Sequence, residues 1–129
     1  MIVVDASTVL DVLLGIGAAE AIAARLFSDH ETLHAPHLLD LEITQALRRL
    51  AAAGTVPPAR AGEALDDLAD LPVDRYAHQF FLERIWQLRH TLTAYDAAYI
   101  ALAEALGAPV VTRDGGFARR GHHAAVEVF

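Results

Sequence analysis

The segment from residue 91 to residue 107 constrains the fold of this chain more than any other. It reads TLTAYDAAYIALAEALG and is apolar on nearly all sides, which predicts a helix that is buried over most of its surface. Thr93 suits the N-cap position of this helix, and Gly107 suits its end, just before Pro109. A short apolar strand at 109–114 follows and ends in Asp114. We therefore expect a buried helix that leads directly into an inner strand.

The rest of the chain alternates short apolar runs with helical patterns. Further strands are predicted at 2–4, 32–35, 73–76 and 125–129, and further helices at 9–14, 18–27, 38–53, 57–71 and 79–89. This alternation predicts an α/β fold, with a central parallel twisted sheet of about four to five short strands and helices on both faces. Because no linker or repeat divides the chain, we expect a single domain over residues 1–129.

The composition excludes several kinds of chemistry. The chain has no cysteine and no lysine, and all ten of its basic residues are arginine. Disulfides, thiolate metal sites, lysine phosphate loops and Schiff bases are therefore excluded. The net charge of −7 has the wrong sign for general binding to nucleic acid, so a nucleic-acid substrate would have to meet local arginines and metal ions. No segment resembles a signal peptide or a membrane span, so we expect a cytoplasmic protein.

Four acidic residues stand where a sheet of this kind binds ligands. Asp5 and Asp114 end strands, and the carboxyl ends of parallel strands form the ligand-binding edge. Glu42 lies at the border of the apolar arc of its helix, and Asp96 points to the packed side of its own. Each also has an ordinary structural explanation, such as helix capping, snorkelling or a turn. Four clustered carboxylates, however, need neutralisation, which a hard cation such as Mg²⁺ provides.

The chain resembles a known family, the PIN-domain nucleases, and within it the VapC-type toxins of prokaryotic toxin–antitoxin pairs. The resemblance lies in four segments, in the order of that family: Val3–Ser7, 41–43, Thr93–Tyr99 and 111–117. It implies a PIN-like fold in which Asp5, Glu42, Asp96 and Asp114 form a catalytic, metal-binding quartet.

The resemblance also implies an activity. The expected reaction is endonucleolytic cleavage of RNA by a water molecule that Mg²⁺ activates, with Mn²⁺ as a substitute. Its expected effect is inhibition of translation and growth. Ser7 and Thr112 would orient the carboxylates by hydrogen bonds. Arg113 and Arg119 or Arg120 are candidates for phosphate contacts, and plain surface charge is the equal alternative for them.

The partners that the resemblance implies are a second copy of the chain and a VapB-type antitoxin. The antitoxin's C-terminal segment would lie in an apolar groove between the N-terminal helices and the third helix, with positions 13–14 and 38–39 as groove residues. Arg49 would pair with Glu42 or meet RNA. The aromatic and apolar group at 80, 81, 85 and 86 is expected in the core and at an interface, and the acids at 63, 66, 67 and 70 on a solvated face.

Other functions fit the sequence less well. His34 and His37 have a zinc-like spacing but lack further ligands, so we expect ordinary surface or packing histidines. A phosphatase of the haloacid dehalogenase type also has an aspartate at the end of its first strand. It needs a second aspartate where Ser7 stands, and a lysine. A PIN-like module that binds without cleaving is the remaining alternative.

Overall fold

Five parallel strands form the single sheet of this protein. The computed structural model describes all of residues 1–129. The strands lie in the order β3-β2-β1-β4-β5, and every neighbouring pair is parallel. Their bounds are β1 Ile2–Val4, β2 Leu33–Pro36, β3 Val73–Tyr76, β4 Val110–Thr112 and β5 Val126–Val128. The β-branched residues of β1 are fully buried at the centre of the sheet.

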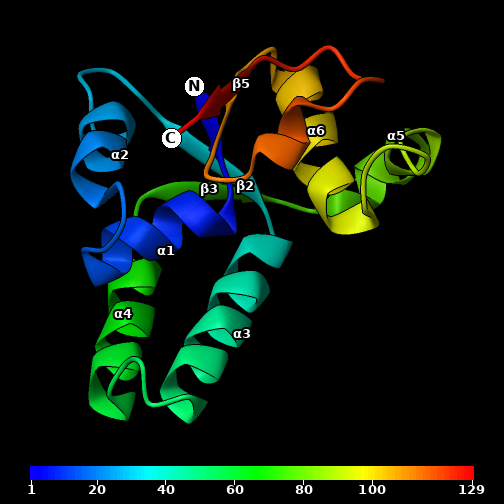
Figure 1. Ribbon diagram of the computed structural model, residues 1–129. Helices are drawn as coiled ribbons and strands as arrows, with labels where there is room; N and C mark the ends of the chain where they lie inside the picture. Colours follow the sequence, from blue (N-terminus) through cyan, green and yellow to red (C-terminus); the bar gives the residue numbers. More distant parts are fainter.

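Helices connect the strands and cover the sheet on both sides. Figure 1 shows α1 and α2 on one side of the strands and α5 and α6 on the other, with α3 and α4 extending away below. Their bounds are α1 Ala6–Leu14, α2 Ala19–Leu26, α3 Leu38–Ala52, α4 Pro58–Asp70, α5 Leu82–Gln87 and α6 Ala94–Leu106, with 3₁₀ turns η1 His78–Phe81 and η2 Gly115–Ala118. The predicted α/β class with a parallel sheet is confirmed. None of these helices has the length and apolar character needed to cross a membrane.

The helix α6 has the caps that its sequence predicts. Thr93 accepts a hydrogen bond from the backbone N–H of Asp96 at 3.2 Å. At the other end, Gly107 adopts a left-handed backbone with φ 63°, which a residue with a Cβ adopts only with strain. Seven consecutive residues of α6, from 97 to 103, are buried. This all-round burial explains why the helix is apolar on every side.

The predicted start of α1 was wrong by three residues. The helix begins at Ala6 rather than at residue 9, because Asp5 is its N-cap and accepts a hydrogen bond from the backbone N–H of Thr8 at 3.1 Å. The chain therefore turns from β1 into α1 at Asp5 itself. This sharp turn leaves the Asp5 side chain at the carboxyl edge of the sheet.

The segment predicted as one helix at 79–89 consists of η1 followed by the short α5. Phe81 and Ile85 are partly buried against the core, but Phe80 and Trp86 are 78% and 67% exposed. The prediction of a place in the core holds for Phe81 and Ile85 but not for Phe80 and Trp86, since a helix this short presents one narrow face to the core. The predicted interface stays a prediction. Phe27, the last residue of the helix predicted at 18–27, lies beyond the end of α2 and is exposed.

The histidines with zinc-like spacing separate in the structure. His34 is buried in β2, where its ring nitrogens lie 2.8 Å from Thr32 Oγ1 and from Tyr76 Oη. His37 is exposed. His34 is thus a packing histidine that joins β2 to β3. The acids of α4 lie on its exposed face, as predicted, at positions 63, 66, 67 and 70.

Candidate active site

All four predicted acids line one cavity at the carboxyl edge of the sheet. Asp5 follows β1, Glu42 lies in α3, Asp96 lies in the first turn of α6, and Asp114 follows β4. The cavity has a volume of about 320 Å³, and its lining residues are Asp5, Ala6, Ser7, Leu10, Glu42, Ala46, Asp96, Tyr99, Asp114 and Phe117. Four segments that are distant in sequence therefore bring their carboxylates to one place.

Asp5 is the most firmly held of these acids. Its side chain is buried, and Ser7 Oγ donates to its two oxygens at 2.7 and 2.9 Å. Thr112 Oγ1 donates to Oδ2 at 2.7 Å, and Thr8 donates to Oδ1 through its backbone and side chain. Burial raises the pKa of Asp5, and these hydrogen bonds to the charged form oppose the rise. The donors fix the carboxylate in one orientation.

The same hydroxyls connect Asp5 to the turn that carries Asp114. Ser7 Oγ accepts from the backbone N–H of Arg113 at 3.0 Å, and Thr112 Oγ1 accepts from the backbone N–H of Asp114 at 2.9 Å. Asp114 then caps η2, with its Oδ1 accepting from Gly116 N–H at 2.7 Å. Ser7 and Thr112 thus have the orienting contacts predicted for them, within a continuous hydrogen-bond network.

Glu42 and Asp96 are half-buried on the other side of the cavity. Burial raises the pKa of Glu42, and the charges of Asp96 and Asp5 add to this rise. Burial also raises the pKa of Asp96, together with the charges of Asp114 and Asp5. The carboxylates are therefore close enough to repel one another through a partly desolvated space. A cation in this cavity would relieve that repulsion.

Two residues of the site were not singled out from the sequence. Thr8 is fully buried and bonds both the backbone oxygen and the side chain of Asp5. Tyr99 is buried on α6 and donates its hydroxyl to Glu42 Oε1 at 2.7 Å. Tyr99 follows Asp96 by three residues, so the helical repeat places both on one face of α6. That spacing is the signal by which Tyr99 could have been found.

The candidate arginines lie in different surroundings. Arg113 forms an ion pair with Asp11 on α1 and does not line the cavity. Arg119 is exposed, its positive charge favours the ionised form of Asp96, and its Nη1 donates to Thr91 O at 3.4 Å. Arg120 is exposed as well. Of the three, Arg119 is the one whose charge acts on an acid of the cavity.

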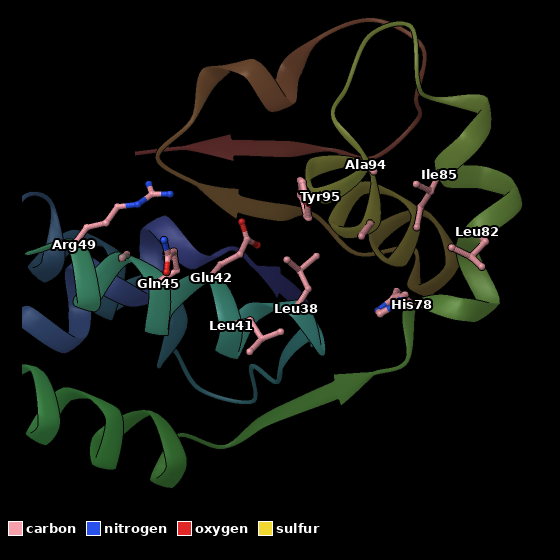
Figure 2. A pocket seen from close by; sticks show the side chains of 12 residues that line it. Leu38, Leu41, Glu42, Gln45, Arg49, His78, Leu82, Ile85, Ala94 and Tyr95 are labelled. Carbon is pink, nitrogen blue, oxygen red and sulfur yellow. The ribbon is translucent and has the colours of Figure 1, made fainter.

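A larger apolar groove adjoins the acidic cavity and shares Glu42 and Ala46 with it. Figure 2 shows Leu38 and Leu41 of α3 on one side of this groove and Leu82 and Ile85 on the other. Its volume is about 690 Å³, and the remaining lining residues are Gln45, Arg49, His78, Ala94, Tyr95 and Ala98. Of the predicted antitoxin-groove positions, Leu38 lines this groove and positions 13, 14 and 39 do not. Leu13 and Leu39 are buried, and Leu14 packs against the core.

The donor set of the cavity fits a hard divalent ion. All four acids offer oxygen ligands, which Mg²⁺ and Mn²⁺ prefer. As the side chains lie, no three of them converge closely enough to enclose an ion by themselves. Mg²⁺ does not need such a cage, because it keeps several waters and takes one or two carboxylates together with substrate phosphate. The cavity therefore fits an ion that water and substrate complete.

Comparison with known proteins yields one consistent family. The PIN domain family model matches residues 2–122. "VapC ribonuclease Mb0985" of Mycobacterium bovis is 47% identical over 114 residues, which cover 88% of this chain and 86% of that protein. "Ribonuclease VapC12" of Mycobacterium tuberculosis is 39% identical, over 99% of this chain and 98% of its own. The crystal structure of PAE2754 from Pyrobaculum aerophilum has a TM-score of 0.72 at 26% identity, over 96% of this chain and 87% of its own.

Proposed function

The chain belongs to the PIN-domain family, in its VapC branch, and on that basis we propose that it is a metal-dependent endoribonuclease toxin. The observation that carries the proposal is the convergence of Asp5, Glu42, Asp96 and Asp114 on one cavity. The relatives named as VapC ribonucleases support RNA as the substrate. Single-domain organisation over residues 1–129 and action in the cytoplasm, where RNA is made and translated, belong to the same proposal.

The four carboxylates would hold Mg²⁺, or Mn²⁺ in its place. When bound, such an ion lowers the pKa of a water that attacks phosphorus and neutralises charge on the phosphate. Ser7, Thr8 and Thr112 keep Asp5 aimed at the cavity. The Ser7 hydroxyl donates to both oxygens of Asp5, which suits an orienting role. In this proposal the chain's own residues bind the ion and orient the carboxylates, and water supplies the attacking oxygen.

Arg119 is the cation that we propose for contact with a phosphate of the RNA. It is exposed, and its positive charge lowers the pKa of Asp96, an acid of the cavity. Arg113 is held by Asp11 instead, so its side chain stabilises the turn after β4. An arginine whose charge acts on an acidic cavity offsets part of the repulsion that an incoming phosphate meets.

The proposed partners are a VapB-type antitoxin and a second copy of the chain. The groove of about 690 Å³ between α3 and α5 is the surface that we assign to the antitoxin, since apolar grooves of this kind accept amphipathic segments. Because the groove shares Glu42 with the acidic cavity, a segment lying in it would also reach the carboxylates. Binding there would block the access of RNA.

RNA cleavage by the antitoxin-free chain tests this proposal. Cleavage in Mg²⁺ or Mn²⁺ should stop in EDTA, and Asp96→Asn should lower it by at least about 100-fold, because a metal-ligating charge is lost. The Thr93 cap stays in place, so the variant should fold. Asp66→Asn, on the exposed face of α4, is the matched control and should cut normally. Equal cleavage by Asp96→Asn, or cleavage that persists in EDTA, would contradict the proposal.

A further inference from the structure

Tyr99 makes one polar contact, and it reaches across the cavity. The residue is 1% exposed and lies on α6, one turn beyond Asp96. Its hydroxyl donates to Glu42 Oε1 at 2.7 Å, and its ring packs edge-on against Phe117 with a centroid distance of 6.1 Å. Phe117 belongs to η2, the turn that Asp114 caps. Tyr99 thus contacts α3 and η2, the elements that carry or adjoin two other acids of the site.

Glu42 depends on this contact because little else holds its carboxylate. Asp5 is fixed by donors from Ser7, Thr8 and Thr112, whereas the hydrogen bond from Tyr99 is the one that the Glu42 side chain receives. A glutamate side chain also has more rotatable bonds than an aspartate and loses more conformational entropy when it is ordered. Without a partner, the Glu42 carboxylate would adopt several orientations in the cavity and at its rim.

The hydrogen bond from Tyr99 to Glu42 joins two different helices. The helix α3 packs mainly against α1 and α4, while α6 packs against α5, η1 and the strands β1 and β2. The Tyr99–Glu42 hydrogen bond therefore links two helices whose main packing partners differ, while both also contact β2. It occupies Oε1 and leaves Oε2 without a partner.

We propose that Tyr99 is a positioning residue that orients Glu42 so that its second oxygen faces the metal ion; this inference rests on the proposed function. At neutral pH a phenol is a hydrogen-bond donor and a carboxylate is an acceptor, which is the pairing seen here. Hydrogen bonds to metal-ligating carboxylates typically change metal affinity or activity 10- to 100-fold when they are lost. Tyr99 acts through Glu42 and does not itself contact the ion.

Titration of Mn²⁺ into the RNA-free chain, read by calorimetry, tests this role with Tyr99→Phe. The variant keeps the ring against Phe117 and removes only the hydroxyl. Mn²⁺ affinity should fall by about 10-fold or more, and half-maximal RNA cleavage should require correspondingly more Mg²⁺. Tyr76→Phe is the matched control, since it also removes a phenol hydroxyl that is bonded to a side chain, His34, far from the acids. That control should bind Mn²⁺ like the wild type.

The coupling between the two residues separates positioning from general stability. In a Glu42→Gln background, Tyr99→Phe should cause no further loss of Mn²⁺ affinity, because its effect passes through the Glu42 carboxylate. Unchanged Mn²⁺ affinity in Tyr99→Phe would overturn the positioning role. So would a loss in the Glu42→Gln background as large as the loss that Tyr99→Phe causes in the wild type. Either result leaves the nuclease proposal intact. A wild-type chain that binds no Mn²⁺ would contradict the metal site itself, and the positioning role with it.

Discussion

Asp5 shows how one side chain can serve the fold and the site together. It ends β1, caps α1 and lines the acidic cavity, and it does so with both oxygens hydrogen-bonded. Capping and metal binding are compatible because a carboxylate has about four lone-pair sites. The structural explanation for this aspartate and the functional one are therefore both consistent with its geometry.

Replacing Thr112 with valine should shift the pH dependence of cleavage. The Thr112 hydroxyl stabilises the charged form of Asp5, so its loss should raise the pKa of Asp5 further above its ordinary value. Because a metal ligand must be deprotonated, the acidic limb of the pH profile of kcat/KM should move to higher pH. The free energy of unfolding should also fall by about 2 kcal/mol, since Asp114 N–H loses its acceptor as well.

Thr112→Ser keeps the hydroxyl and serves as the control for this prediction. Its acidic limb should coincide with that of the wild type. An unchanged acidic limb in Thr112→Val would show that the hydroxyl does not act on an essential carboxylate.

Among the elements, α6 joins the core to the site. Its buried middle holds the helix on the sheet, and its first turn carries Asp96 into the cavity. The position of Asp96 therefore depends on how well the first turn of the helix is formed. That turn is stabilised by the Thr93 cap.

Thr93→Ala should lower the free energy of unfolding by about 1 kcal/mol, because the Asp96 N–H loses its acceptor. Cleavage should weaken too, since fraying of the first turn moves Asp96. Urea unfolding and cleavage rates measure the two effects. Thr93→Ser retains the cap and should behave like the wild type in both; a loss in the serine variant equal to that in the alanine variant would show that the cap is not the cause.

The elements also show how far the sequence predicts the structure. The helix α6 was predicted closely because its caps and continuous apolar run point to the same boundaries. The start of α1 was missed because Asp5 ends a strand and begins a helix at a single residue. Which members of the group at 80, 81, 85 and 86 pack against the core could not be predicted, because side-chain type does not reveal how little of a short helix the core can cover.

The same limit applies to the site. Asp5 and Asp114 follow from the rule that parallel strands end at one edge, and Glu42 and Asp96 from their position on apolar helix faces. The bond between Tyr99 and Glu42 could not be predicted, because it depends on how far apart α3 and α6 lie across the cavity. The groove between α3 and α5 could not be predicted for the same reason, since a groove is formed by elements whose distance the sequence does not specify.

On the scale of the whole molecule, two sets of acids behave differently. The acids of α4 lie in water on an exposed face, whereas those of the cavity are partly desolvated and repel one another. A chain with a net charge of −7 attracts cations over much of its surface. A metal site formed by the four carboxylates requires that divalent ions prefer the cavity to the exposed acidic face of α4.

Paramagnetic broadening of backbone amide signals by substoichiometric Mn²⁺ tests this requirement most directly. Amides from all four segments should broaden first, in both the presence and the absence of RNA: Ala6, Ile43, Ala97 and Gly115. Asp96→Asn should weaken this broadening, and amides of α4 should stay sharp at the same Mn²⁺ concentration. Broadening that begins along α4, or that spares any of the four segments, would contradict a shared metal site formed by these carboxylates.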